Sequence, residues 1–457
     1  MMLNLILASI QSILQVIIIV LFGSILTKAG YFTTEKQKWL SKLNMVFFTP
    51  CLLFSNIASV ISFEKLLAYW PIPVFYLTFA SLSYISTQLI SRIVRLSEPY
   101  RRFALACTMF SNTNSLPIAV IASLAVSEGG KVLYWGADDT QNDVAARGIS
   151  YTLFFAIFGN ILRWSYGYSL LQNDGKGGLG SDEGTVVVEY GATHHGDEEI
   201  SQHLSSPPSS LSRRSLLDDA EEGQIFSRPD STTTIAGEHH KPVNETTSLL
   251  SSFPHLPGDE NDNKQRPAWV EKIVKIARLI NSYMTPPLYA ALLALFVGLI
   301  PPLKDLMYDK QGFLYPSLTS AIQSCGKAAV PIILVCLGAQ LTDILQMHRS
   351  SLALTKPVMT AVAVRTLLLP LMVIPIVIAF VNFGSSWSAI ASDPVFSTMM
   401  IIVGCTPTAI NLVQICQVTG AFEDDMLRVL FWSYGVICVP MFTLVVFLAL
   451  NIVDRFL

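Results

Sequence analysis

Apolar runs broken by short polar turns fill two long stretches of the chain, residues 3–172 and 272–451. A helix that crosses a bilayer needs ~20 mostly apolar residues, and each stretch holds five runs of about that length. The predicted spans, set to within several residues, are 3–27, 40–60, 67–91, 102–126 and 148–171, then 283–301, 317–342, 354–382, 395–419 and 426–451. The pattern therefore predicts an all-α membrane protein with ten transmembrane helices.

The segment between the two stretches has the opposite character. Residues 173–266 are rich in Ser, Gly, Pro, Asp and Glu and show no sustained apolar periodicity. Such a segment buries too little apolar surface to offset the entropy that is lost when it becomes ordered. We therefore divide the chain into a first five-helix membrane repeat (1–172), a disordered loop (173–271) and a second five-helix membrane repeat (272–457).

Basic residues near the span ends predict the orientation, because Lys and Arg are retained on the cytosolic side. The richer set of connections, on the side of the long loop, holds Lys28, Lys36, Lys38, Lys42, Arg92, Arg95, Arg101, Arg102, Arg349, Lys356 and Arg428. The poorer set holds Lys65, Lys131, Arg147, Lys304, Lys310 and Arg455. The loop is thus predicted to be cytosolic and both termini luminal or extracellular. The two five-helix halves then have opposite orientations, as in carriers built from inverted repeats.

The composition agrees with a membrane protein and argues against several other classes. Hydrophobic residues make up 51% of the chain and charged residues 14%, with a net charge of −3 and a mean hydropathy of +0.49. Without a basic field, a Walker loop, a dinucleotide fingerprint or zinc-type cysteine spacing, we expect no nucleic-acid partner, no cofactor and no metal. The spans also contain no HExxH, GxSxG or paired aspartates, which argues against an enzyme.

A polar segment with a proline interrupts both the fourth and the ninth span. The fourth reads ACTMFSNTNSLPIAVIASLA and the ninth MMIIVGCTPTAINLVQICQVTG. Proline removes one backbone N–H and frees a carbonyl four residues earlier, and in hydrocarbon such groups need side chains, water or ligand as partners. In inverted-repeat carriers, paired interruptions of this kind form the substrate site. The candidate substrate-binding residues are Asn112, Thr113, Asn114, Ser115 and Pro117, together with Thr406, Pro407, Thr408, Asn411 and Gln414.

The interrupted helices also indicate the charge of the substrate. A half-helix that starts at a break directs unpaired N–H groups and a positive dipole end into the site, which suits an anion such as a carboxylate. A proline kink satisfied by its own Ser and Thr neighbours is the alternative for one break, but its recurrence in both halves argues against it. A second pair of prolines, Pro50 and Pro331, lacks the amide cluster and is interpreted as kinks in scaffold helices.

Ionisable residues within the spans bear on the mechanism. No Asp or Glu lies near the centre of any predicted span, although proton and sodium sites in carriers commonly use one; this favours a uniporter. Sodium can also be held by carbonyls and amides, so coupling stays an alternative. Lys327 and Arg365 are the deepest cations. Either could attract the anion, or its long side chain could instead reach the interface or pair with helix ends.

The breaks SNTNSLP and TPTAINLVQ, the five-loop-five layout and the acidic step into FWSYG (Glu423, Asp424, Asp425) resemble the auxin efflux carrier family. The resemblance is greatest to PIN-LIKES proteins, including fungal members, and covers both membrane halves but not the loop. It implies an elevator-type carrier in which broken helices 4 and 9 cross, with Asn112, Asn114 and Pro117 at the first crossing and Pro407, Asn411 and Gln414 at the second. It also implies indole-3-acetate or a similar anion as substrate, an endoplasmic reticulum membrane and a homodimer.

Three functions follow from these observations. The first is uniport of auxin-like or other monocarboxylate anions through the lipid bilayer, driven by the electrochemical gradient. The second is a carboxylate carrier of the same fold coupled to protons or sodium. The third is a receptor or scaffold that transports nothing and acts through its cytosolic loop. A receptor has no need of two polar interruptions at the midplane, whereas a carrier does, so transport is favoured.

Overall fold

The computed structural model describes residues 2–113, 115–136, 138–172, 284–346 and 354–456. The predicted disordered loop (173–271) and Asn114 lie outside the described residues. Within the described ranges the chain is helical and forms no β-strand, so the predicted all-α class is confirmed there.

The first half runs from α1 to α9. Two short turns of π-helix and one of 3-10 helix are built into this series. The elements are α1 (Met2–Lys28), α2 (Thr34–Leu43), the π-helix η1 (Asn44–Phe48), α3 (Thr49–Val60), α4 (Phe63–Ala68), α5 (Pro71–Ile93), α6 (Glu98–Met109), α7 (Ser115–Val126), the 3-10 helix η2 (Glu128–Leu133), α8 (Gln141–Leu162), the π-helix η3 (Arg163–Gly167) and α9 (Tyr168–Leu170).

The second half runs from α11 to α19 and contains three further π-helical segments. The elements are α11 (Pro286–Leu299), α12 (Pro301–Tyr308), the π-helix η5 (Tyr315–Thr319), α13 (Ser320–Gln346), α14 (Lys356–Ala363), the π-helix η6 (Val364–Leu368), α15 (Leu369–Gly384), the 3-10 helix η7 (Ala389–Ser392), α16 (Pro394–Cys405), α17 (Asn411–Thr419), α18 (Glu423–Leu430), the π-helix η8 (Phe431–Ile437) and α19 (Cys438–Phe456).

All ten predicted spans fall on one helix or on consecutive helices. Five of these series in the described chain are long and apolar enough to cross a membrane, namely Thr34–Val60, Gln141–Leu170, Tyr315–Thr342, Lys356–Gly384 and Glu423–Phe456. A sixth candidate is the pair α11 and α12, which bends by 103°. The bend comes where Ile300 takes an extended conformation (φ −99°, ψ 105°), because a residue before proline, here Pro301, is disfavoured in the helical region.

Both polar interruptions are breaks in the helical backbone. After α6, Phe110 is extended (φ −100°, ψ 108°), and α7 starts at Ser115 with Pro117 in its first turn, where a missing N–H costs no hydrogen bond. After α16, Thr406 is extended (φ −63°, ψ 153°), as expected before Pro407. Each interrupted span is therefore two half-helices joined by a short extended segment.

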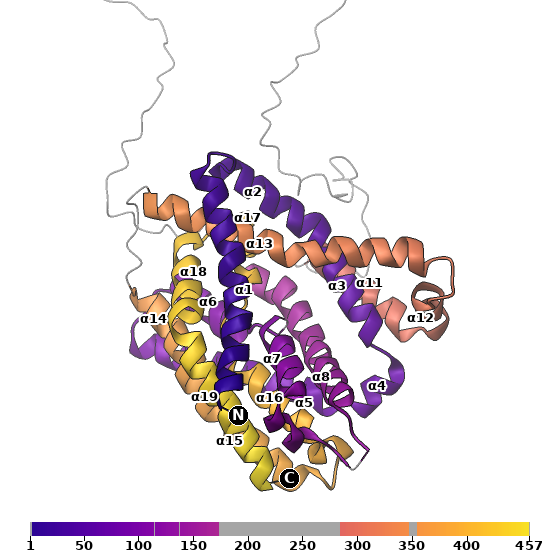
Figure 1. Ribbon diagram of the computed structural model, residues 1–457. Coiled ribbons are helices and arrows are strands. Elements are labelled where there is room, and N and C mark those ends of the chain that lie inside the picture. Colours follow the sequence, from indigo (N-terminus) through magenta and orange to yellow (C-terminus); the bar gives the residue numbers. More distant parts are fainter. Residues whose placement is uncertain (1, 114, 137, 173–283, 347–353, 457) are drawn as a thin grey trace, which may run out of the picture. The chain divides into compact units, whose positions relative to one another are not determined.

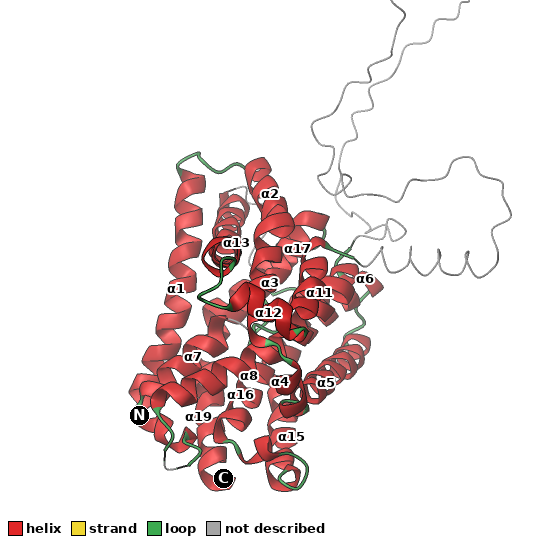
Figure 2. Ribbon diagram, turned by 90° about the vertical axis from the view of Figure 1, so that its right-hand side faces the viewer, coloured by secondary structure: helices red, strands yellow, loops and turns green. Residues whose placement is uncertain are grey.

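The helices form two packing groups, each with members from both halves of the sequence. In the first packing group, α1, α2 and α3 lie against α13, and α3 also contacts α11 (Figure 1). In the second packing group, α5–α8 pack with α14–α19. The groups meet where α1 passes α7 and α19, where α8 lies against α3 and α11, and where α17 lies against α2 and α13. The start of α1 and the end of α19 lie at the same end of the bundle (Figures 1 and 2).

Candidate functional site

The two helix breaks lie side by side and hydrogen-bond through their backbones. The N–H of Asn112 donates to the carbonyl of Pro407 (2.9 Å), and the N–H of Ala409 donates to the carbonyl of Phe110 (2.9 Å). Ser111 and Thr408 form an isolated antiparallel bridge between them. Backbone groups that the broken helices leave free are thus partly satisfied by the other break, as burial in a low-dielectric interior requires. The two interruptions form one structural unit, which we call the crossing (residues 110–113 and 406–410).

A tyrosine from the last helix series holds the crossing together. The hydroxyl of Tyr434, in η8, donates to the carbonyl of Thr408 (2.8 Å) and accepts from the side-chain amide of Asn112 (2.9 Å). The hydroxyl of Thr408 in turn donates to the carbonyl of Cys107, near the end of α6 (2.9 Å). Asn112 is therefore oriented by a partner more than 300 residues away, which no local signal in the sequence identifies.

Two buried arginines donate to backbone carbonyls of the crossing and of the helix ends next to it. Arg365, 3% exposed, donates from Nε to Thr406 (2.7 Å), from Nη1 to Thr108 (3.1 Å) and from Nη2 to Gly404 (3.1 Å). Arg163, 2% exposed, donates from Nη2 to Ser111 (3.1 Å) and from Nη1 to the side chain of Asn160 (3.1 Å). Both arginines, like Tyr434, come from π-helical segments, which occur frequently at functional sites.

A cavity of about 330 Å³ opens beside the crossing. It is mostly apolar, with Gln15, Asn56, Asn112, Lys327 and Tyr434 as its polar members. The described residues that line it are Gln15, Val16, Ile19, Leu52, Asn56, Asn112, Leu116, Ile118, Ala119, Lys327, Val330, Pro331, Leu334, Ile410 and Tyr434. This volume lies within the ~300–1,000 Å³ typical of small-molecule sites, which are likewise apolar with a few convergent polar groups.

The cavity lies at the boundary of the two packing groups. Its cation, Lys327, belongs to α13 of the first group, whereas Asn112 and the start of α7 belong to the second. Lys327 has no hydrogen bond or ion pair with any described residue. Its ammonium group is therefore available to a ligand in the cavity.

The other predicted site residues have several different positions. Thr113 and Pro117 are buried, and the Thr113 hydroxyl has no hydrogen-bond partner within the described part of the chain. Ser115 begins α7, and Asn411, 9% exposed, begins α17. Gln414 points away from the cavity toward α2 and α3, where its amide contacts the hydroxyl of Thr49 and the carbonyl of Ser41 (both 3.3 Å).

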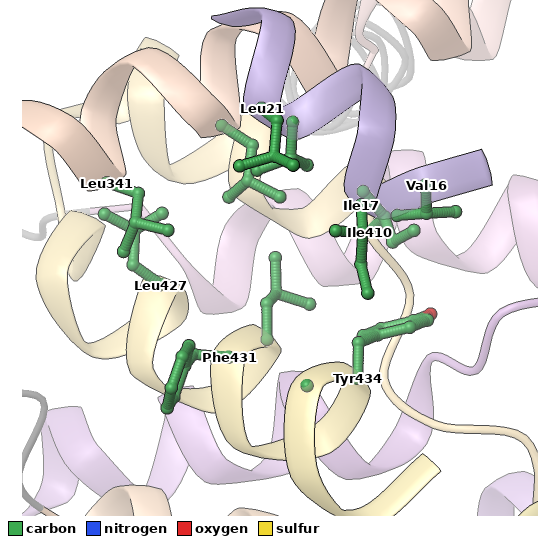
Figure 3. A pocket seen from close by; sticks show the side chains of 12 residues that line it. Val16, Ile17, Leu21, Leu341, Ile410, Leu427, Phe431 and Tyr434 are labelled. Atoms are coloured by element: carbon green, nitrogen blue, oxygen red, sulfur yellow. The ribbon is translucent and has the colours of Figure 1, made fainter. Parts of the chain in front are cut away.

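An apolar groove adjoins the cavity (Figure 3). Its volume is about 260 Å³, and it shares Val16, Ile410 and Tyr434 with the cavity. The tyrosine hydroxyl points away from Leu341 and Leu427 (Figure 3). The described residues that line it are Val16, Ile17, Val20, Leu21, Leu337, Leu341, Ile410, Leu427, Leu430, Phe431, Tyr434 and Gly435. The cavity with its polar groups and the apolar groove therefore adjoin, so that one ligand could place a polar head in the cavity and an apolar body in the groove.

Amides and hydroxyls form a ladder across the boundary of the packing groups. The Ser41 hydroxyl donates to Gln417, Gln417 donates to Gln340 (2.8 Å), and Gln340 donates to Glu423 (3.1 Å). Glu423 also pairs with Lys38 (3.3 Å). Residues of α2 and α13 alternate along this ladder with residues of α17 and α18, so every step joins the first packing group to the second.

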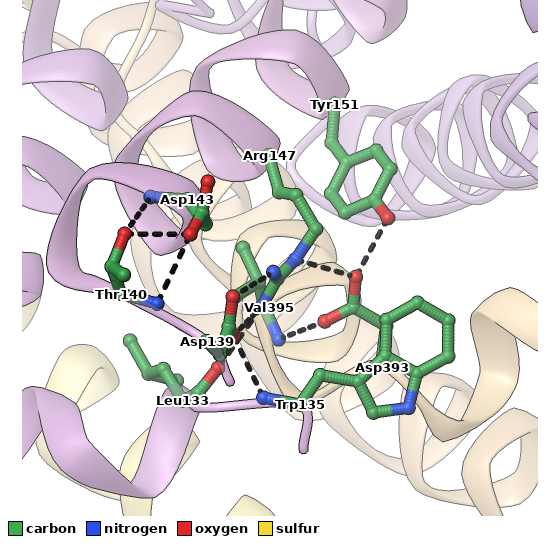
Figure 4. Close-up of polar contacts among 9 residues, drawn as sticks. All are labelled: Leu133, Trp135, Asp139, Thr140, Asp143, Arg147, Tyr151, Asp393 and Val395. Atoms are coloured by element: carbon green, nitrogen blue, oxygen red, sulfur yellow. Dashed lines mark hydrogen bonds and ion pairs between the residues drawn. The ribbon is translucent and has the colours of Figure 1, made fainter. Parts of the chain in front are cut away.

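A second polar cluster joins the start of α8 to the start of α16 (Figure 4). Arg147 lies between Asp139 (Nη2 to Oδ2, 2.6 Å) and Asp393 (Nε to Oδ2, 3.2 Å), and Tyr151 donates to Asp393 (2.7 Å). The hydrogen bond from Arg147 lowers the pKa of Asp139, whereas burial raises the pKa of Asp393. Sequence reasoning missed this cluster, although an Asp followed by proline at the first helical position is a typical helix-start signal.

Helices long and apolar enough to cross a bilayer, and two broken helices paired at a cavity, define a membrane protein with the architecture expected of a carrier. Comparison with known proteins gives the family. A model of the family described as membrane transport protein matches residues 8–446, so the chain belongs to this family. The chain is 33% identical over 452 residues to an uncharacterized transporter of Schizosaccharomyces pombe, an alignment that covers 97% of this chain and 95% of that protein.

Other relatives come from yeast and plants. An uncharacterized transporter of Saccharomyces cerevisiae is 30% identical over 436 residues, covering 95% of this chain and 93% of that protein. Protein PIN-LIKES 2 of Arabidopsis thaliana is 26% identical over 448 residues, covering 94% and 91%. The resemblance to the auxin efflux carrier family and its PIN-LIKES members is confirmed.

Proposed function

We propose that the protein is a secondary carrier of small organic anions, either auxin-like molecules such as indole-3-acetate or other monocarboxylates. The observation that carries the proposal is the cavity at the crossing, where an unpaired lysine and an oriented asparagine amide meet. Both α7 and α17 begin at the breaks, so their positive dipole ends belong to the same site. The lysine, the asparagine amide and the two helix N-termini would all stabilise an anionic head group. The apolar lining of the cavity and the adjoining groove would accommodate an apolar body.

Alternating access by an elevator-type movement fits the same arrangement. The cavity is lined partly by the first packing group and partly by the second. Displacement of the second group along the first would carry the crossing and its ligand between the two faces of the membrane. The start of α1 and the end of α19 lie at one end of the bundle, as an even number of membrane-spanning segments requires. We propose ten transmembrane helices in two inverted five-helix repeats.

The proposed transport is uniport driven by the electrochemical gradient. The described residues that line the cavity include no Asp or Glu, and such residues commonly serve proton and sodium sites. A monovalent anion gains ~2.3 kcal/mol per 100 mV of membrane potential, which suffices to drive its accumulation. We further propose luminal termini and a cytosolic loop because of the distribution of basic residues, and an endoplasmic reticulum membrane and a homodimer because of the resemblance to the auxin efflux carrier family.

Coupling to protons is the second candidate function. The observation that favours it is the carboxylate of Asp393, which is fully buried and has a raised pKa because of that burial. It lies at the start of α16, the first half of the second broken helix. Protonation of Asp393 would affect the crossing through α16, which connects the two.

The proposal is tested by uptake of radiolabelled indole-3-acetate and a panel of short carboxylates into proteoliposomes, first with an imposed potential alone and then with an added sodium or pH gradient. Uniport predicts saturable, potential-dependent flux. Flux that requires a pH gradient would support the proton-coupled carrier instead, and no flux under any gradient would exclude transport of these anions.

Asn112→Ala provides the site-directed test of the proposal. Loss of a hydrogen bond to a charged group costs ~1.5–3 kcal/mol, so we expect the KM for the anion to rise by about 10- to 100-fold. Asn451→Ala is the matched control, because Asn451 is an exposed asparagine that bonds only to its own helix. Equal uptake by the two variants would show that the anion binds elsewhere.

A further inference from the structure

The C-terminal ends of the half-helices α6 and α16 converge on one point, and the guanidinium of Arg365 occupies it. Each of its three nitrogens donates to a different carbonyl, those of Thr108, Gly404 and Thr406, at 2.7–3.1 Å. Thr108 lies in the last turn of α6 and Gly404 in the last turn of α16. One side chain thus donates to a carbonyl in the last turn of each of the two half-helices and to the carbonyl of Thr406.

This position has a strongly negative potential. A helix C-terminus is equivalent to about −0.5 elementary charge, and two such ends meet here. In secondary carriers with interrupted helices, half-helix C-terminal ends and unwound carbonyls are the groups that coordinate the coupling cation. Arg365 is 3% exposed and forms no ion pair with any carboxylate of the described residues, so the carbonyls themselves stabilise its charge.

We propose that Arg365 is a covalently attached substitute for a coupling cation. The inference rests on the proposed carrier function and adds the reason why its transport is uncoupled. The guanidinium neutralises the negative ends of α6 and α16 permanently, whereas the positive ends of α7 and α17 remain available to the anion. No sodium ion is then needed to assemble the crossing. The net charge of the site with substrate bound differs from that of the empty site only by the charge of the substrate.

The arrangement of donors distinguishes this role from simple packing. A guanidinium is a planar, always charged group with several N–H donors in a fixed geometry. Here each of its three nitrogens donates a hydrogen bond to a carbonyl. An apolar side chain of similar length would fill the space but leave three buried carbonyls without partners. Each unsatisfied buried group costs free energy, and their combined field would attract a small cation in its place.

The test is cation dependence in Arg365 variants reconstituted in proteoliposomes. We expect uptake by the wild type to be unchanged when sodium is replaced by choline. Arg365→Ala should lose at least about tenfold in uptake, equivalent to ~1.4 kcal/mol, and should regain activity when guanidinium or sodium is added but not when choline is added. Arg365→Lys, which keeps the charge and three donors, should retain most of the activity, whereas Arg365→Met should not.

A binding measurement separates this inference from the proposed function. Calorimetric titration of purified Arg365→Ala with sodium chloride should show saturable heat that the wild type lacks, and this result does not depend on knowing the substrate. Arg455→Ala, at an exposed position near the end of α19, is the control and should behave like the wild type in both assays. Sodium-stimulated uptake by the wild type, full activity of Arg365→Met, or the absence of both rescue and sodium binding in a folded Arg365→Ala would each overturn the proposal.

Discussion

At the scale of single residues, the side chains of the site act through groups that are distant in sequence. Lys327 lies on α13 and Asn112 on the extended segment before α7, yet both line one cavity. Tyr434, from η8, bonds to both breaks at once. The site therefore depends on the packing of helices from both halves, and a substitution at any of these positions reports on the crossing as a whole.

Lys327→Gln should weaken anion binding without unfolding the protein. The lysine is exposed to the cavity and has no partner among the described residues, so its removal leaves no buried group unsatisfied. Loss of a charged hydrogen-bond donor costs ~1.5–3 kcal/mol, which corresponds to a rise in KM of about 10- to 100-fold. Lys310→Gln, at another exposed lysine, is the control, and an equal KM in both variants would contradict a role for Lys327 in binding.

At the scale of elements, the cluster around Arg147 fixes the start of α8 against the start of α16 (Figure 4). Its two carboxylates respond to pH in opposite directions. Because the pKa of Asp139 is lowered in the folded protein, its contribution to stability is present above the ordinary pKa of Asp, ~3.9, and is lost as the pH falls below that value. Because burial raises the pKa of Asp393, its ionisation opposes folding as the pH rises through the raised value.

Asp139→Asn should therefore lower the Tm at neutral pH but not at strongly acidic pH. In the wild type the charged pair with Arg147 contributes at pH 7, whereas near pH 3 the Asp139 of the unfolded chain is mostly protonated and much of that contribution has gone. Measured by thermal unfolding in detergent, the difference between wild type and variant should narrow from pH 7 to pH 3. Asp138→Asn, at the exposed neighbour, should show no such narrowing, and a constant difference for Asp139→Asn would assign its effect to packing.

The elements also show what can be read from one sequence. The breaks in the fourth and ninth spans were predictable because proline and amide residues interrupt an apolar run locally, and the fold confirms that the helix stops at both. The ends of α5 and α11 differ from the predicted spans because Pro71 and Pro301 start new helices. The structural roles of Arg163, Tyr434 and Asp393 were not predictable, since each depends on partners brought close only by tertiary packing.

At the scale of the whole molecule, the boundary between the two packing groups is the surface on which an elevator would move. The amide ladder from Ser41 to Lys38 crosses that boundary at each step. Its first two links are neutral hydrogen bonds, each of which contributes only ~0.5–1.5 kcal/mol net, and the last two join the carboxylate of Glu423 to Gln340 and Lys38. The ladder can therefore stabilise one relative position of the two packing groups, and breaking it requires only a moderate free energy.

Linking the two groups covalently should stop transport. In a background without the seven native cysteines, Ser41→Cys with Gln417→Cys places two thiols across the boundary, where the native side chains are hydrogen-bonded. Bridging them with mercuric ion should abolish uptake, and a thiol reagent that removes the metal should restore it. Thr87→Cys with Thr108→Cys, whose hydroxyls lie 2.6 Å apart within the second group, is the control. Undiminished uptake in the bridged boundary pair would mean that the groups do not slide there.

The π-helical segments constrain how the gene can change. Five of them occur in the described chain, and those at Arg163–Gly167, Val364–Leu368 and Phe431–Ile437 carry the side chains that hold the crossing. A π turn accommodates one residue more than an α turn. Deleting one codon there would turn the π turn into a regular α turn and leave the helix beyond it in nearly the same orientation, but the side chain that the wider turn directs at the crossing would be lost or displaced. A one-residue deletion in these segments should therefore leave the helix itself intact but remove the contacts of Arg163, Arg365 or Tyr434 with the crossing.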